Sequence, residues 1–463
     1  MTLWTAEQAV LATGGQAVGD WAVTGVSIDT RTLQTGDLFV ALKAARDGHE
    51  FVANALASGA GAALVSRIPD GVDDTAPLLI VPDVQTALED LGRAARARTK
   101  AKVIAVTGSV GKTSTKEMLR EMLGQCGTTH ASVASYNNHW GVPLTLARMP
   151  IDTDFAVIEI GMNHPGEIAP LAKMAAPDVV LVTTIAEVHL EAFQDINGIA
   201  LEKASIIDGL VPNGVAIMNA DTPCTKVIKN CTQHVTTYWF GADGEHASVI
   251  NVQVGGEETQ ANLMVAGEPY RVAIRSAGRH FAMNAMGALL AVGYLGAKRT
   301  TAALGLAQWA PVGGRGARQT LNISGGTLDL IDDAYNANPT SLRAAMQVLA
   351  QADATRKIAF LGDMKELGEK EHDFHRDVAQ WPCTDAIDVI HTVGPLMKSL
   401  HDVLPQGKRG LHFDDSNAMA AHAERLVQVG DAVLLKASLS TNMRKVVDAI
   451  QELGHPRSDN KGP

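Results

Sequence analysis

The residues whose types and spacing most clearly allow chemistry form one short glycine-rich segment. Glycines at positions 108 and 111 would let backbone N–H groups point at a phosphate, and the Lys112 ammonium could reach the β- and γ-phosphates of a nucleotide. The hydroxyl that follows, on Thr113, suits Mg²⁺. The commonest form of this loop, G-x-x-x-x-G-K-[ST], would need glycine where Val106 stands. The predicted nucleotide site comprises Thr107, Gly108, Ser109, Val110, Gly111, Lys112, Thr113 and Ser114.

A strand and a helix must flank this loop if its groups are to meet at one phosphate. Residues 103–106 form an apolar, β-branched run, which predicts a buried strand. After Lys112, the apolar residues Met118, Leu119 and Met122 follow helical spacing. A helix that begins at the loop would add the partial positive charge of its N-terminus to the site.

A second candidate group is Glu159, which ends the apolar run 155–158. A buried carboxylate is costly unless it is paired or bound to a metal. Because enzymes that transfer phosphoryl groups take an acid from a neighbouring strand for Mg²⁺, we predict that role for Glu159. A plain ion pair with a nearby cation is the alternative. Asn137 and Asn138, by residue type alone, predict only a loop whose backbone groups they satisfy.

Length, charge and composition exclude several classes of protein. The 463 residues predict about three domains, and the net charge of −11 argues against a nucleic-acid partner. The chain contains no uninterrupted apolar run of about 18 residues and no basic, apolar N-terminal segment, so we expect neither a membrane span nor a signal peptide. The four cysteines lack metal-ligand spacing, which favours reduced thiols in a cytoplasmic protein.

Alternating strands and helices predict an α/β protein of three domains. We expect a small α/β domain over residues 1–98, whose basic end, from Arg93 to Lys100, predicts a solvated helix face and a linker. A central, mostly parallel sheet around the nucleotide loop is expected over 99–310, with an antiparallel excursion at 243–275. A Rossmann-like, doubly wound domain is expected over 311–455, beginning with a glycine-dense hinge, and a disordered tail over 456–463.

Six further segments carry motifs that occur together in one enzyme family. They are D-[ST]-R-x-[LV]-x-x-G-D-L-F-x-A at 29–41, D-G-H-x-F at 47–51, N-N-x-x-G-x-P-L-T-L at 137–146, H-L-E-x-F at 189–193, D-D-A-Y-N-A-N-P at 332–339 and G-D-M-x-E-L-G at 362–368. With the nucleotide loop, they resemble the Mur ligase family of ATP-dependent enzymes that form amide bonds. The loop is also similar to that of folylpolyglutamate synthases.

The resemblance implies roles for individual residues. His189 would bind a second Mg²⁺, and Lys203 would react with CO₂ to give a carbamate that binds this ion. The implied catalytic set is Lys112, Glu159, His189 and Lys203, and the implied Mg²⁺ ligands are Thr113, Glu159, His189 and Lys203. Besides the loop, ATP would contact Asn284, Arg315 and Asn336. The other substrates would contact Ser27, Arg31, Asp47, Gly48, His49, Asn137, Asn138, Asp333, Tyr335 and Asn338, of which the first five would hold a UDP group. The chain departs from the family at Ser205, where glutamate is common, and at Ala437 and Leu439, in place of glycine and arginine.

Within the family, D-D-A-Y-N-A-N-P is similar to the members that join D-alanyl-D-alanine to UDP-N-acetylmuramoyl-tripeptide (UDP-MurNAc-tripeptide) through an acyl phosphate. The resemblance therefore implies a cytoplasmic ligase of peptidoglycan synthesis, which we expect to be a monomer. Three alternatives are open. They are a sister ligase that adds a single amino acid, a nucleotide hydrolase that needs no sugar peptide, and a non-catalytic sugar-nucleotide-binding relative.

Overall fold

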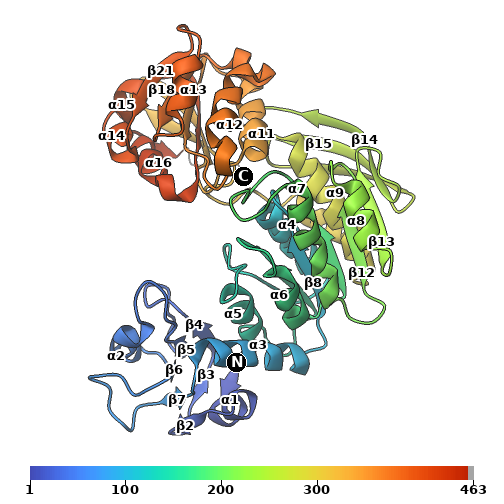
Figure 1. Ribbon diagram of the computed structural model, residues 1–463, viewed down its shortest axis with the longest axis vertical. Helices are drawn as coiled ribbons and strands as arrows, with labels where there is room; N and C mark the ends of the chain where they lie inside the picture. The colour runs from blue at the N-terminus through green and yellow to red at the C-terminus, as the bar shows by residue number, and fades with distance from the viewer. Residues whose placement is uncertain (457–463) are drawn as a thin grey trace, which may run out of the picture.

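The computed structural model describes residues 1–456, in which three main sheets follow one another along the chain (Figure 1). The first sheet has the order β2-β7-β6-β5-β4, and all its pairs are parallel except β2 with β7. Its strands are β2 (Gln16–Val18), β4 (Gly25–Ser27), β5 (Asp37–Val40), β6 (Ala62–Val65) and β7 (Leu78–Ile80). The accompanying elements are β1 (Trp4–Thr5), which pairs with β3 (Ala22–Val23), and α1 (Ala6–Thr13), α2 (Val52–Ala57) and α3 (Val84–Arg98).

The second sheet has nine strands in the order β16-β15-β14-β13-β12-β11-β8-β10-β9. Its parallel part comprises β8 (Lys102–Thr107), β9 (Thr129–Ala131), β10 (Phe155–Glu159), β11 (Val179–Val182), β12 (Val215–Asn219) and β13 (Thr236–Gly241). The predicted antiparallel excursion is confirmed by β14 (Ala247–Val254), β15 (Thr259–Val265) and β16 (Glu268–Ile274). Because β8 lies between β11 and β10, the loop after it opens at the carboxyl edge of the sheet, where α/β proteins bind ligands.

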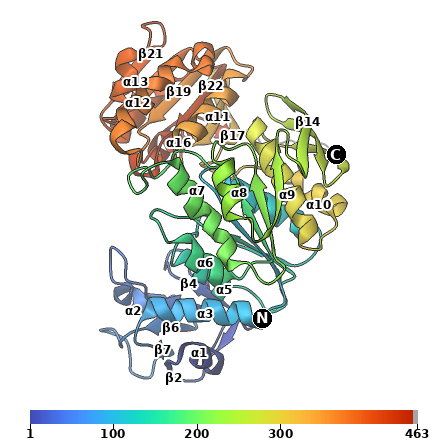
Figure 2. The ribbon, with the colours of Figure 1, turned by 45° about the vertical axis from the view of Figure 1, so that its right-hand side comes forward.

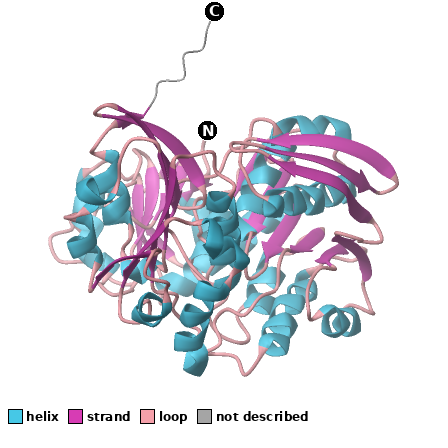
Figure 3. Cartoon of the chain, turned by 90° about the horizontal axis from the view of Figure 1, so that it is seen from above, coloured by secondary structure: helices cyan, strands magenta, loops and turns pink. Residues whose placement is uncertain are grey.

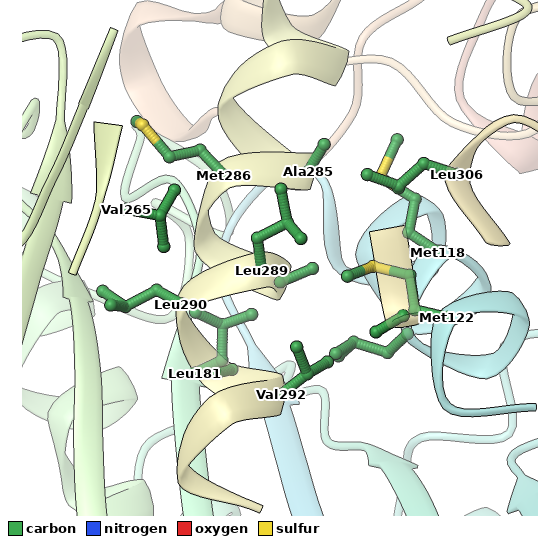
Figure 4. Packing of buried hydrophobic residues seen from close by; sticks show 14 of the residues in the cluster. Met118, Met122, Leu181, Val265, Ala285, Met286, Leu289, Leu290, Val292 and Leu306 are labelled. Carbon is green, nitrogen blue, oxygen red and sulfur yellow. The ribbon is translucent and has the colours of Figure 1, made fainter. Parts of the chain in front are cut away.

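The helices of the central part fix the position of the nucleotide loop. They are α4 (Lys112–Gly124), α5 (Gly141–Ala147), α6 (Ile168–Ala175), α7 (Ile196–Ala204), α8 (Thr225–Cys231), α9 (Arg279–Tyr294) and α10 (Arg299–Leu306). Helix α9 is apolar on most sides, as expected of a helix inside a core. Figure 4 shows it between Val265 of β15 and Met118 and Met122 of α4, all of them buried. This packing holds the helix that follows the loop.

The third sheet has the order β21-β20-β19-β22-β18-β17-β23, and its strands from β21 to β18 are parallel. Its strands are β17 (Ala317–Ile323), β18 (Gly326–Asp333), β19 (Arg356–Gly362), β20 (Val389–Val393), β21 (Arg409–Phe413), β22 (Asp431–Lys436) and β23 (His455–Pro456). The helices are α11 (Pro339–Ala350), α12 (Glu371–Asp377), α13 (Lys398–Val403), α14 (Ser416–Ala420), α15 (Ala423–Leu426) and α16 (Arg444–Gln451). Figure 3 shows the strands and helices of the chain from above. Alternate residues of β19 and β22 pack in two buried clusters, one with α11 and α13 and the other with α14 and α16, so helices cover both faces, which confirms the doubly wound arrangement.

The first and second sheets meet through α3, which lies between the N-terminal strands and α5 and α6 (Figure 2). Leu88 and Leu91 of α3 share one buried cluster with Leu144 and Ala147 of α5. At Gly92 the two helices come so close that a Cβ would lie 3.0 Å from the Pro143 carbonyl oxygen. The N-terminal part therefore docks on the central part through a shared apolar core.

Two arginines at the end of α3 correct the expectation of a solvated linker. Arg96 donates hydrogen bonds to the Ala175 and Ala176 carbonyls at the end of α6. Arg98 donates to the Leu3 carbonyl and lies over the Trp4 ring at 3.9 Å. Both guanidinium groups thus satisfy backbone acceptors between the parts, since polar groups buried at such a contact need partners.

The C-terminal end differs in part from the predicted tail. Pro456, expected to be disordered, pairs with Leu321 of β17, so the sheet continues further than residue types suggest. The rest of the predicted tail, 457–463, lies outside the described residues. Within residues 1–456, no helix has the length and apolar character needed to cross a membrane. The domain boundaries after residues 98 and 310 stay predictions.

Candidate active site

The nucleotide loop has the geometry that its glycines predict. Gly108 has a φ of 150°, and a Cβ there would lie 1.9 Å from the hydroxyl oxygen of Thr183, so no other residue fits. Gly111 has a φ of 89° and lies against the side-chain amide of Asn284. Ser109 N–H donates to the Thr184 carbonyl over 2.7 Å, which fixes the loop against the end of β11. Asn284, predicted near the nucleotide, thus lies beside the loop.

Two sources of positive charge converge at this loop. Helix α4 begins at Lys112 without a side-chain cap, so its first N–H groups are left for a ligand. The Lys112 ammonium donates a hydrogen bond to the Gly108 carbonyl over 2.5 Å, so the lysine side chain folds back over the loop. Burial lowers the pKa of Lys112 to about 8, with Glu159 opposing and Arg315 adding to the shift. The side chain therefore still carries a charge at neutral pH.

The carboxylate of Glu159 is fully buried beside the loop. Its Oε1 accepts hydrogen bonds from Thr113 Oγ1 over 3.2 Å and from Asn137 Nδ2 over 2.7 Å. Its Oε2 is buried and has no hydrogen-bond partner among the described residues. A buried carboxylate oxygen without a partner is a costly feature that a bound cation would relieve. The hydroxyl and carboxylate together are hard oxygen donors of the kind that Mg²⁺ prefers, so this site fits the predicted ion.

Lys203 lies near the end of α7 with only 1% of its surface exposed, although a lysine there would be expected on the helix surface. Burial, and then the charge of Lys112, hold the pKa of Lys203 well below its usual value. A lowered pKa increases the share of neutral amine, which is the form that can react with CO₂. Ser205, which replaces the family's glutamate, donates to the Glu202 carbonyl over 2.7 Å and so closes the helix end.

His189 follows β11 and contacts the C-terminal part of the chain. Its Nδ1 forms a short ion pair with Glu366 Oε2, from the loop after β19. Leu190 N–H donates to the Glu366 carbonyl over 2.9 Å, so the two loops are joined twice. The Nε2 atom of His189 has no hydrogen bond to any described residue. The imidazole lines the cleft between the second and third sheets.

The opposite wall of this cleft comes from β18, β22 and the segment after α10. Asp333 ends β18, and its Oδ2 accepts from the Lys436 ammonium over 2.5 Å. Burial raises the pKa of Asp333, which the Lys436 charge opposes. Arg315 lies over the Tyr335 ring at 4.2 Å and donates to the Ser135 hydroxyl over 2.7 Å, so it bridges both walls.

Three predicted ligand-binding asparagines have local structural tasks. Asn338 Oδ1 accepts from Ser341 N–H and caps α11. Asn138 Oδ1 accepts from Gly141 N–H at the start of α5, and Asn336 Oδ1 accepts from Ala337 N–H. The amide NH₂ group of each makes no hydrogen bond to a described residue, so it can donate to a ligand. All three line the cleft.

The cleft has a volume of about 1060 Å³ and gathers most of the predicted site. The predicted residues that line it are Ser109, Val110, Gly111, Lys112, Thr113, Ser114, Asn137, Asn138, Glu159, His189, Asn284, Arg315, Asp333, Tyr335, Asn336 and Asn338. Thr107, Gly108 and Lys203 lie behind this surface. The structure thus brings together residues that span some 230 positions of the chain.

Sequence reasoning missed two residues that line the cleft and a third that contacts His189. Lys436 ends an apolar strand as Glu159 does, and that shared signal could have identified it. His280 lies on α9, and burial followed by the Lys436 charge lowers its pKa to about 4. Glu366 belongs to the G-D-M-x-E-L-G motif, but no residue pattern in the sequence predicts its contact with His189.

The predicted UDP-binding residues lie apart from this cleft, at the carboxyl edge of the first sheet. Ser27 ends β4 and its hydroxyl contacts the Asp29 carbonyl, while the exposed Arg31 pairs with the Asp29 carboxylate over 2.6 Å. Asp47 and Gly48 begin the turn that precedes α2. His49 is buried, and its ring contacts Asp47 through Nδ1 and Ser66 through Nε2.

Comparison with known proteins identifies the family of the chain. Residues 106–292 match the model of the Mur ligase middle domain, and residues 319–439 match that of the Mur ligase glutamate ligase domain. A UDP-N-acetylmuramoyl-tripeptide--D-alanyl-D-alanine ligase of Escherichia coli strain K12 is 37% identical over 94% of this chain and 95% of its own. The crystal structure of MurF from Acinetobacter baumannii has a TM-score of 0.83 at 31% identity, over 97% of this chain and 99% of that one. A MurF ligase from Thermotoga maritima, solved in complex with ADP, has a TM-score of 0.75 at 26% identity, over 93% and 97% of the two chains. The chain therefore belongs to the Mur ligase family.

Proposed function

We propose that this chain joins D-alanyl-D-alanine to UDP-MurNAc-tripeptide and converts ATP to ADP and phosphate in doing so. The observation that carries the proposal is the cleft, in which a phosphate-binding loop and a buried acid face a second wall of charged residues. Relatives named for this reaction match the chain over nearly its whole length, which supports the same substrates here. The product would be UDP-MurNAc-pentapeptide for peptidoglycan synthesis. The cytoplasmic location and the monomeric state of the enzyme remain predictions.

The first chemical step would transfer the γ-phosphoryl group of ATP to the terminal carboxylate of the tripeptide. A carboxylate is a poor electrophile, and the acyl phosphate gives it a leaving group. Both reactants are anions, so the step needs positive charge at the transferred group. Lys112 and the uncapped N–H groups of α4 supply that charge at fixed positions.

Mg²⁺ would be held by Thr113 and Glu159, and a second ion by His189 and the carbamate of Lys203. Bound there, Mg²⁺ supplies further charge neutralisation to the phosphates. Asn137 holds the Glu159 carboxylate in place through the 2.7 Å hydrogen bond to Oε1. The low pKa that burial gives Lys203 supports the carbamate, because only the neutral amine reacts with CO₂.

The second step would be attack of the dipeptide amine on the acyl phosphate, with release of phosphate from a tetrahedral intermediate. We assign the wall formed by Asp333, Tyr335, Asn336 and Asn338 to the adenosine and the dipeptide. Lys436 holds this segment by its bonds to Asp333 and to the Asn336 carbonyl. Approach of the two walls would align the reactants and keep water from the acyl phosphate.

The sharpest test of this assignment is the choice of amine and acyl substrate. Purified protein with ATP and Mg²⁺ should convert UDP-MurNAc-tripeptide and D-alanyl-D-alanine to a product with the mass of the pentapeptide. A product formed only from a shorter UDP-MurNAc-peptide and a single amino acid would assign the chain to a sister ligase. ATP hydrolysis at the same rate with and without any sugar peptide would support a nucleotide hydrolase. Tight binding of the sugar nucleotide without turnover would support a non-catalytic relative.

A further inference from the structure

The contact between His189 and Glu366 joins two parts of the chain that sequence separates by 177 positions. His189 lies in the loop after β11 of the central sheet, whereas Glu366 lies in the loop after β19 of the third sheet. The ion pair uses Nδ1 of the imidazole, and a backbone hydrogen bond from Leu190 to the Glu366 carbonyl reinforces it. The carboxylate thus reaches His189 from the third sheet.

The backbone at both residues is held in an uncommon conformation. His189 has a φ of 55° and Glu366 a φ of 64°, in the left-handed region that residues other than glycine seldom adopt. Such conformations cost free energy and persist where the surroundings fix them. Two loops that each carry this cost at the point of contact indicate a contact with a specific geometry.

Because Glu366 contacts Nδ1 of the His189 ring, Nε2 is the ring nitrogen that is left for another ligand. When the imidazole is neutral, a carboxylate that accepts from Nδ1–H selects the tautomer in which Nε2 carries the free lone pair. That is the arrangement in which a second residue orients a metal-binding histidine, and its loss typically weakens metal binding by about 10–100-fold. His189 is 20% exposed and lines the cleft, so Nε2 is accessible to an ion there.

We propose that Glu366 is a positioning residue that orients His189 so that its Nε2 can bind the second Mg²⁺. The proposal rests on the function proposed above, in which His189 is a ligand of that ion. Because Glu366 belongs to the third sheet, the complete metal site forms only when the two walls of the cleft are together. Metal binding and approach of the C-terminal part are therefore coupled through this one carboxylate.

A structural surface ion pair would behave differently. The Glu366 side chain is 52% exposed, and ion pairs as exposed as this one contribute little to stability. If the contact only joined the two parts, its loss would leave the affinity for a metal ion unchanged. Metal affinity therefore separates the two roles, whereas activity alone would not.

The experiment is a titration of the full-length protein with Mn²⁺ in the presence of a non-hydrolysable ATP analogue, with free Mn²⁺ measured by electron paramagnetic resonance. We expect Glu366→Ala to weaken the second Mn²⁺ site by about 10-fold or more while the first site keeps its affinity. Glu366→Gln, whose amide oxygen can still accept from Nδ1–H, should recover most of the affinity. Glu369→Ala removes a nearby exposed acid without a side-chain partner among the described residues, so it should bind as the unaltered protein does.

His189→Ala separates failure of this inference from failure of the proposed function. If His189→Ala weakens the second site and Glu366→Ala does not, Glu366 has no positioning role. If His189→Ala leaves both sites unchanged, the assignment of His189 to the metal is itself wrong. Should Glu366→Ala fail to fold, Glu366→Lys keeps a long side chain but cannot accept a hydrogen bond, and the same criteria apply to it.

Discussion

The hydroxyl of Thr113 donates a hydrogen bond to Glu159 Oε1 over 3.2 Å, although 46 positions separate the two residues in the chain. Thr113 lies in the first turn of α4, after the loop that follows β8. Glu159 ends the adjacent parallel strand β10, where it pairs in register with Val106. Parallel pairing therefore places the acid beside the phosphate-binding loop. The Oε2 of Glu159 has no hydrogen-bond partner among residues 1–456, so it could act with the Thr113 hydroxyl as an oxygen donor to the proposed Mg²⁺.

Replacement of Glu159 by glutamine should abolish most activity without loss of the fold. The amide keeps the size of the side chain but removes the charge that would hold Mg²⁺, so we expect kcat to fall by about 10²-fold or more. Steady-state kinetics over a range of Mg²⁺ concentrations would check this. Full activity at ordinary Mg²⁺ concentration would show that Glu159 is only an ion-pair or hydrogen-bond partner.

Removal of the loop lysine should have a comparable effect on turnover. Lys112→Ala takes away the ammonium that reaches the phosphates, and we expect kcat to fall by about 10²–10³-fold with an unchanged circular dichroism spectrum. Lys173→Ala, which removes an exposed lysine of α6, is the matched control. Activity retained by Lys112→Ala would refute the assignment of the nucleotide loop.

The carbamate on Lys203 should be directly detectable. Burial keeps the pKa of this amine well below its usual value, so a larger share of it is neutral, and able to react with CO₂, than in an exposed lysine. Protein in ¹³C-bicarbonate should give a carbamate ¹³C signal that Lys203→Gln loses and Lys173→Gln keeps. As pH falls through the lowered pKa, protonation of the amine competes with the carbamate, and signal and activity should decline together. An unmodified Lys203 in an active enzyme would contradict the prediction.

The joint between the N-terminal and central parts should depend on Trp4. Its ring is 2% exposed, lies under Arg98, and donates through Nε1 to the Ala147 carbonyl over 2.9 Å. We expect Trp4→Ala to lower the free energy of unfolding by about 3–5 kcal/mol in urea. Leu11→Ala, at a side chain that is 87% exposed, should change it by less than about 0.5 kcal/mol. If the two substitutions lowered the free energy of unfolding equally, the contact of Trp4 between the N-terminal and central parts would not be important for stability.

The two walls of the cleft should approach each other when both substrates bind. Gly314 N–H and Gly316 N–H donate to Asp332, so the later part of the 311–316 segment is hydrogen-bonded to the third sheet. The hinge is therefore expected before Gly314. Small-angle scattering with an ATP analogue and UDP-MurNAc-tripeptide together should give a smaller radius of gyration than either ligand alone. An unchanged radius would exclude closure as the step that assembles the site.

The sequence predicts the local elements well and the long-range contacts poorly. Runs such as 103–106 and 155–158 identify strands because parallel strands are buried on both faces and need continuous apolar residues. The glycines of the loop are likewise predictable, since their φ values admit little else. The Asn338 cap of α11 agrees with its residue type, because asparagine is one of the preferred residues at a helix N-cap.

The contacts between separate parts carry no such local signal. Arg315 with Ser135 and Glu366 with His189 depend on how two sheets sit against each other, which no spacing in the chain encodes. Burial of Lys203 also escaped prediction, because one charged residue on a helix is ordinarily solvated. These residues needed the resemblance or the structure itself to be singled out.

The most direct test of the central claim is phosphate release from ATP in the presence of UDP-MurNAc-tripeptide, measured with and without D-alanyl-D-alanine. We predict that steady release requires the dipeptide and that one pentapeptide forms for each phosphate released. Equal rates of release with and without the dipeptide would contradict the proposed ligase and leave a nucleotide hydrolase on the same fold.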